Sequence, residues 1–117
     1  MRAAPERLAP RTRRLLASPV NELLLSAASV WELAIKSALG KVRLPAPLWE
    51  YVPSRLAEDN VLPLPVQHEH ALRVAALPHH HRDPFDRLLV AQAQIEGLSL
   101  LTANRQLGVY DVVVIRA

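Results

Sequence analysis

The chain contains no cysteine and few aromatic residues. Disulfide bonds and thiolate metal sites are therefore excluded, and a reducing cytosol is compatible, so we expect a cytoplasmic location. Only 4% of the residues are aromatic although 50% are hydrophobic, so the core must be built from leucine, valine, isoleucine and alanine. No stretch approaches the roughly 18 uninterrupted apolar residues of a membrane span. A length of 117 residues suits one core, so we expect residues 1–117 to form a single domain without a membrane partner.

Lysine is also scarce, and arginine takes its place. Lysine occurs only at Lys36 and Lys41, and the other twelve of the 14 cationic residues are arginine. The formal net charge is +3 and the isoelectric point is near 10.0. The planar arginine fork suits phosphate better than the point charge of lysine does, so the charge favours a nucleic acid partner. Compositional bias of a genome can also enrich arginine and alanine.

Apolar periodicity predicts strands that alternate with helices. We expect extended segments at 22–26, 61–66, 98–104 and 111–117, helices near 10–17 and at 29–39, 48–59, 67–77 and 83–96, and a helical turn at 104–110. Gly40 and Gly97 stand where C-cap glycines belong, and Pro53 implies a kink or a late start in its helix. Alternation of this kind predicts an α/β fold with helices packed on a parallel sheet.

Several polar side chains follow the expected strands. Glu32 lies one turn into the helix after the first strand, and Asp86 lies one turn into its own helix, preceded by Asp83. Asn104 follows a later strand, with Thr102 beside it. Because parallel α/β sheets bind ligands beyond the carboxyl ends of their strands, these groups can converge if the strands are neighbours. Carboxylates without cysteine suit Mg²⁺ or Mn²⁺ rather than zinc, and such ions support attack of water on a phosphodiester.

The same residues also match structural patterns. Ser29-Val30-Trp31-Glu32 fits the S-x-x-E capping box, and Asp83-Pro84-Phe85-Asp86 fits an Asp N-cap, a Pro at the first helical position and an acid at the third. Thr102 and Asn104 equally suit a turn at a strand end. The motifs alone leave both interpretations open.

Nearby side chains have structural interpretations as well. We expect the histidines at 68, 70 and 79–81 in solvated loop and helix positions, where they could still titrate near a phosphate. We expect Trp31 in the core rather than in a base-stacking platform, because it lies on the apolar side of its helix. Arg82 and Arg87 are expected to face solvent, and their place beside the candidate site makes them the preferred phosphate contacts.

Two long blocks of sequence resemble the PIN-domain family, specifically the VapC-type toxins of bacterial toxin–antitoxin pairs. The blocks are LLLSAASVWELAIKSALGKVRLP and LPHHHRDPFDRLLVAQAQIEGLSLLTAN, followed by Tyr110 and VVVI, and the resemblance runs from about Leu8 to the C-terminus. It implies a three-layer αβα sandwich with a central, mostly parallel sheet. It also implies Mg²⁺- or Mn²⁺-dependent endoribonuclease activity, with Glu32 and Asp86 at the family's second and third acidic positions. The implied partners are an RNA substrate, a cognate antitoxin whose segment occupies an apolar groove, and a second copy in a homodimer.

The chain departs from the family pattern in two places. Family members open with a strand that carries an aspartate, and this chain begins past that point, so we expect the first strand and the first acid to be missing. Loss of that strand would leave an apolar sheet edge open to mispairing. The fourth acidic position is Asn104, which can orient a water but adds no charge, and the next acid is Asp111. Either the native start lies upstream, which the intact mass of the native protein would show, or the chain is a truncated remnant.

Three functional hypotheses remain. The first is a Mg²⁺- or Mn²⁺-dependent ribonuclease toxin, in which Glu32 and Asp86 hold the ion. Its catalytic set comprises Glu32, Asp86, Asp83 and Asn104, and its RNA phosphate contacts are Arg82, Arg87 and Thr102. The second is an inactive module that still binds an antitoxin or RNA. The third is a histidine-rich transition-metal protein, which predicts tight retention of Zn²⁺.

Overall fold

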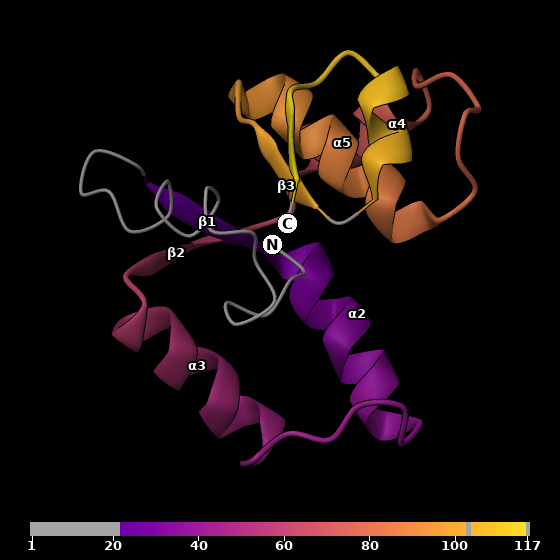
Figure 1. Cartoon of the computed structure of the whole chain (residues 1–117). Helices are drawn as coiled ribbons and strands as arrows, with labels where there is room; N and C mark the ends of the chain where they lie inside the picture. Colours follow the sequence, from indigo (N-terminus) through magenta and orange to yellow (C-terminus); the bar gives the residue numbers. More distant parts are fainter. Residues whose placement is uncertain (1–21, 103, 117) are drawn as a thin grey trace.

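Strands and helices alternate along the chain (Figure 1). The computed structural model describes residues 22–102 and 104–116. The helix expected near 10–17 lies outside the described residues. In chain order the elements are β1 (Leu23–Ser26), α2 (Ala27–Ala38), α3 (Leu48–Glu58), β2 (Val61–Leu64), α4 (His68–Val74), α5 (Pro84–Glu96), β3 (Leu100–Thr102), the 3-10 helix η2 (Arg105–Val109) and β4 (Val114–Arg116). The expected α/β class is confirmed, and in the described part of the chain no helix has the length and apolar character that a membrane span requires.

The strands pair in parallel, as the sequence predicts. β1 pairs with β2, with Leu23 opposite Val61, and β3 pairs with β4, with Leu100 opposite Val114. Among the described residues the strands thus form two separate two-stranded sheets. A cavity of about 270 Å³ is lined by residues of both pairs, including Leu24 and Leu101, and by residues of α5.

Helix α5 forms the centre of the core. Val90 and Ala91 on α5 and Leu107 on η2 are fully buried. α4 packs against α5, and Figure 1 shows the two helices together on the side of the molecule that carries β3. α5 ends at Glu96, and the left-handed backbone of Gly97 (φ 66°) confirms the C-cap expected from the sequence.

Figure 1 shows α2 and α3 below this core, with the loop that joins them at their lower ends. No residue of α3 is buried. α3 begins at Leu48 with Pro53 inside it, so the late start that Pro53 suggested is wrong. α4 ends at Val74, and turns that bond Ala75, Ala76 and Leu77 back to the helix replace its expected last residues.

The buried face of α2 differs from the one that apolar periodicity suggested. Its buried residues are Ala28, Ser29 and Glu32. Trp31 is 61% exposed, so its expected place in the core is wrong. The buried side chains of α2 are small or polar, whereas Trp31, Ile35 and Leu39 on its apolar stripe are exposed.

Candidate functional site

Asp83 caps the N-terminus of α5. Its Oδ1 accepts hydrogen bonds from the amides of Phe85 (2.8 Å) and Asp86 (3.2 Å), and Pro84 occupies the first helical turn. These contacts satisfy two of the amides that a helix start leaves without partners, and Pro84 has no amide hydrogen to satisfy. The N-cap expected at Asp83 is confirmed. The cap also fixes Asp86 in the first turn, where its carboxylate lies beside the helix start.

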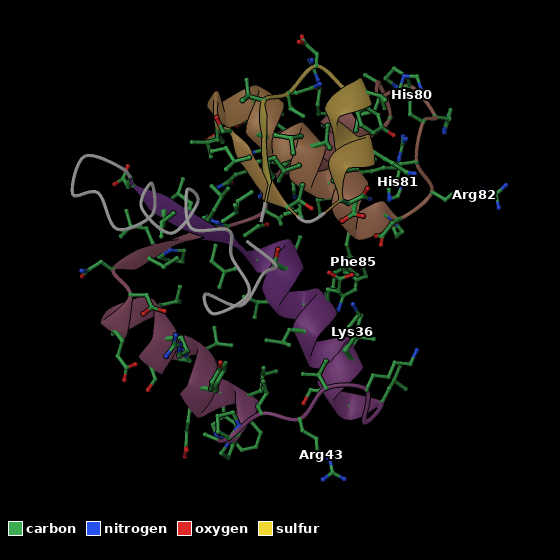
Figure 2. The ribbon with its side chains drawn as sticks, in the orientation of Figure 1. Lys36, Arg43, His80, His81, Arg82 and Phe85 are labelled. Atoms are coloured by element: carbon green, nitrogen blue, oxygen red, sulfur yellow. The ribbon has the colours of Figure 1, made fainter. Side chains whose placement is uncertain are left out.

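Asp86 meets a histidine there. The Nε2 atom of His81 lies 2.9 Å from Oδ2 of Asp86, and Asp86 is only 4% exposed. One ligand atom each from His81, Asp83 and Asp86 lie within 4.8 Å of one another. Figure 2 shows His81 beside the start of α5. We call this group of three residues the α5 cluster. Its two carboxylates were expected from the sequence, whereas His81 was assigned to a solvated loop position.

Glu32 approaches from the other helix of the site. It is 8% exposed, and the Nζ atom of Lys36, one turn along α2, lies 3.7 Å from its Oε2. Glu32 is outside the α5 cluster as defined by the 4.8 Å spacing. The two helices meet next to both acids, because the rings of Trp31 and Phe85 pack edge to face with centroids 5.1 Å apart.

The capping box expected at Ser29 and Glu32 is wrong. α2 begins at Ala27, directly after β1, and Ser26 is the N-cap, with its Oγ accepting from the Ala28 amide at 3.1 Å. Glu32 is therefore too far into the helix to reach the N-cap amide. Its burial beside the α2–α5 contact has no capping explanation, which leaves the metal-ligand interpretation of this acid open.

The two arginines that flank the site have different environments. Arg82 is exposed, and Figure 2 shows its side chain extending away from the body of the protein. Arg87 is 8% exposed, so its expected solvent-facing position is wrong. Its guanidinium donates to the carbonyls of Pro78 (2.9 Å) and Val74 (3.1 Å) and to the Tyr110 hydroxyl (3.2 Å). These acceptors occupy both terminal nitrogens of the guanidinium, so the fork that a phosphate contact would need is already used inside the protein.

The residues after β3 make a capped turn. Thr102 is buried, and its Oγ1 accepts from the Asn104 amide at 3.1 Å. The Oδ1 of Asn104 in turn accepts from the Gln106 amide at 3.0 Å, at the start of η2. The turn interpretation of this pair is therefore confirmed. These contacts use the Thr102 hydroxyl and the Asn104 carbonyl oxygen in holding the chain.

A second group of possible ligands surrounds His70. This histidine is 1% exposed, so its expected solvated position is wrong, and its Nε2 lies 3.4 Å from Oε2 of Glu96, with Glu69 nearby. Its Nδ1 accepts a hydrogen bond from the amide of Gln67 at 2.9 Å and faces Nε2 of Gln92 at 3.4 Å. Because two donors point at Nδ1, the ring proton belongs on Nε2, which donates to Glu96. Because Nδ1 must remain an acceptor, the proton cannot move to it and leave Nε2 available for a metal, so this group is structural.

A model of the PIN domain matches residues 3–113. The chain belongs to the PIN-domain family. It is 46% identical over 59 residues to ribonuclease VapC16 of Mycobacterium tuberculosis, a stretch that covers 50% of this chain and 42% of that relative. The chain thus matches less than half the length of this relative. No solved structure matches the chain.

The α5 cluster of this PIN domain suits a small divalent cation. PIN nucleases generally use such an ion. Mg²⁺ and Mn²⁺ take oxygen ligands in octahedral geometry, and ligands about 2.1 Å from an ion stand at most about 4.2 Å apart. The 4.8 Å spacing of the cluster is compatible with those distances after small adjustments. The positive end of a helix opposes a cation, and the negative charges of Asp83 and Asp86 offset that opposition. The residues therefore fit the ion that the family implies.

Proposed function

We propose that the protein is a Mg²⁺- or Mn²⁺-dependent endoribonuclease toxin of the VapC type. The single observation that carries the proposal is the α5 cluster, which gathers two carboxylates at a helix start in a PIN domain. The similarity to ribonuclease VapC16 supports the choice of RNA as substrate. The excess of arginine supports a polyanionic ligand.

The proposed roles divide among few residues. Asp86 and Asp83 hold the ion from α5, and Glu32 approaches it from α2, either directly or through a water, since Mg²⁺ keeps several of its waters. When bound, the ion neutralises charge on the phosphate and activates a water for in-line attack. Arg82 binds the RNA backbone from the loop before α5. Asn104 positions water through its amide nitrogen, since its carbonyl oxygen holds the Gln106 amide.

The same proposal includes protein partners. A toxin of this type is paired with an antitoxin, and the outward stripe of α2 offers an apolar surface for such a segment. Trp31, Ile35 and Leu39 on this stripe are 61%, 38% and 63% exposed. We also propose that the protein forms homodimers and acts in the cytoplasm, where its RNA substrate is found.

Substitution of the acids tests the activity. Purified full-length protein with Mg²⁺ or Mn²⁺ should cleave RNA, and Asp86→Asn and Glu32→Gln should each lower the rate by about a hundredfold or more. Glu58→Gln and Asp59→Asn on α3 are matched controls, because both acids pair only with Arg55 among the described residues. Equal cleavage by the wild-type protein and both site variants would contradict the proposal, as would equal loss in the control variants.

The second candidate function is a non-catalytic module that binds an antitoxin or RNA. Asn104 favours it, because this residue adds no charge at the fourth acidic position and its carbonyl oxygen serves as a helix cap. Titration with Mn²⁺ separates the two functions. A dead site gives no saturable signal, whereas a nuclease site saturates and loses the signal in Asp86→Asn.

A further inference from the structure

We propose that His81 is a nitrogen ligand of the metal ion, through Nε2, so that the α5 cluster is a mixed imidazole–carboxylate site that prefers Mn²⁺ to Mg²⁺. The inference rests on the proposed function, because it concerns the ion that this function requires. It adds a ligand that the acidic pattern of the sequence did not reveal, and it names the class of cation that the site selects.

The spacing of the His81 and Asp86 side chains matches that of two ligands on one ion. Two ligand atoms about 2.1 Å from an octahedral ion, at right angles to each other, are about 3 Å apart. The Nε2 of His81 and the Oδ2 of Asp86 are 2.9 Å apart. An ion could therefore take the place of the shared hydrogen with little movement of either side chain. Asp83 supplies the third atom of the group from the adjacent helix cap.

The protonation of the ring is compatible with coordination. A histidine that binds a metal through Nε2 must carry its remaining proton on Nδ1. At His70 this arrangement is blocked, because the Gln67 amide donates to Nδ1. Within residues 22–102 and 104–116, the hydrogen bond of His81 is the one to Asp86 through Nε2. Nδ1 of His81 can therefore hold the proton, and of the two histidines that face carboxylates, His81 is the one suited to a cation.

The loop that carries His81 is held in place. Arg87 donates to the carbonyl of Pro78 at 2.9 Å, and the ring of His80 packs edge to face on Tyr110 with centroids 5.2 Å apart. The His81 side chain is 21% exposed and that of Asp86 is 5% exposed. These contacts precede His81 and the helix cap at Asp83 follows it, so a ligand at this position loses little conformational freedom when it binds an ion. These contacts therefore favour metal binding over the solvated role expected for a loop histidine.

The chemistry of the ligands determines which ion the site prefers. Mg²⁺ binds oxygen and retains its waters, whereas imidazole suits transition metals. Mn²⁺ accepts carboxylate oxygen and imidazole nitrogen alike, and two carboxylates with one imidazole leave coordination positions open for water and phosphate. Replacing the imidazole should weaken Mn²⁺ binding by at least about tenfold and change Mg²⁺ binding much less.

Electron paramagnetic resonance of Mn²⁺ bound to the full-length protein tests the ligand directly. We expect pulsed spectra of the wild-type protein to show coupling to a histidine nitrogen, and isotope-labelled histidine should change that coupling. His81→Gln should lose it and bind Mn²⁺ at least about tenfold more weakly. His79→Gln is the matched control, since this exposed histidine of the same loop should leave both measurements unchanged.

A second measurement needs no substitution, in case His81→Gln does not fold. The probe is diamagnetic Zn²⁺, and the measurement is nuclear magnetic resonance of the ring nitrogens of the wild-type protein. Titration should move the resonance of His81 Nε2 to the shift of a metal-bound nitrogen and leave the resonances of His79 unchanged.

The outcomes separate this inference from the proposed function. Saturable Mn²⁺ binding without nitrogen coupling, or with coupling that persists in a folded His81→Gln, overturns the role of His81 and leaves the carboxylate site standing. An unshifted His81 ring at saturating Zn²⁺ does the same. Absence of saturable Mn²⁺ binding overturns both the ligand and the metal site of the proposed nuclease.

Discussion

The guanidinium of Arg87 donates to the hydroxyl of Tyr110, 3.2 Å away, across 23 positions of sequence. Tyr110 is 4% exposed, so the contact is buried. The same guanidinium holds the carbonyls of Val74 and Pro78. One side chain of α5 thereby joins the end of α4, the loop that begins at Pro78 and the segment after η2. Since Arg87 follows Asp86 directly, this junction also supports the backbone of the α5 cluster.

Replacement of Arg87 should therefore destabilise the protein. In Arg87→Met the buried carbonyls and the Tyr110 hydroxyl lose their charged donor, and we expect the free energy of unfolding to fall by about 3 kcal/mol. Arg82→Met is the matched control, because this exposed arginine of the adjacent loop should change stability by less than about 0.5 kcal/mol. Chemical denaturation followed by circular dichroism measures both. An equal, small effect of the two variants would mean that the Arg87 contacts contribute nothing net.

Gly97 should resist substitution for a backbone reason. Its φ is 66°, a region that side-chain-bearing residues rarely adopt, whereas an added Cβ would meet no atom within 4 Å. Gly97→Ala should lower stability by about 1 kcal/mol through backbone strain alone.

Gly108→Ala provides the comparison. There the backbone is not left-handed, and a Cβ would meet only Cγ2 of Val114 at 4.0 Å, an ordinary contact. Thermal denaturation of both variants measures the difference, and a Gly108 variant as unstable as the Gly97 variant would argue against the backbone explanation.

Local signals in the sequence account for much of this fold. The start and end of α5 were predictable because Asp83, Pro84 and Gly97 act on the backbone within one turn. Parallel pairing was predictable from the short apolar runs between helices. The carboxylates of the α5 cluster were predictable for the same local reason, since the first turn of the helix places Asp83 and Asp86 side by side.

The predictions that the structure contradicts concern positions whose environment depends on contacts between residues far apart in the sequence. Periodicity placed Trp31 on the apolar side of α2, but it could not indicate which side of the helix is buried. Trp31 contacts the ring of Phe85 on α5 and is still 61% exposed. The helix start was misplaced because Ser26 and Ser29 both fit a cap. Only the structure places Ser26 against Gln92, 66 positions away. Arg87 looked solvent-exposed because its acceptors are distributed between Val74 and Tyr110.

Gln92 should contribute stability because it joins three segments. Its Oε1 accepts from the Ser26 hydroxyl, and its Nε2 donates to the carbonyl of Pro65 at 3.2 Å. Gln92 is 2% exposed and Ser26 is 3% exposed, so Gln92→Leu leaves the Ser26 hydroxyl buried without its partner and should lower the free energy of unfolding by about 2 kcal/mol.

Gln94→Leu is the control for this substitution. Gln94 also bonds two groups, accepting from Arg73 at 3.1 Å and donating to the Asp111 carbonyl at 3.3 Å, but both bonds are exposed to water. Its loss should cost less than about 1 kcal/mol, since water replaces the partner. Denaturant titration compares the two variants, and equal losses would mean that burial does not set the value of these bonds.

Substitutions at Asp83 separate its two proposed roles, as helix cap and as metal ligand. Asparagine caps a helix about as well as aspartate but is neutral. Asp83→Asn should therefore retain stability to within about 1 kcal/mol, the loss arising from the helix dipole, while Mn²⁺ affinity falls by about tenfold or more. Asp83→Ala should lose both, with about 1 kcal/mol of stability gone for the missing cap.

Calorimetry with Mn²⁺ and thermal denaturation without metal measure the two quantities independently on the same variants. If Asp83→Asn binds Mn²⁺ as tightly as the wild-type protein, Asp83 is a cap only, and the ion must be held by Asp86 with other groups. If Asp83→Asn unfolds as readily as Asp83→Ala, the charge rather than the hydrogen bonds to the Phe85 and Asp86 amides stabilises the helix start.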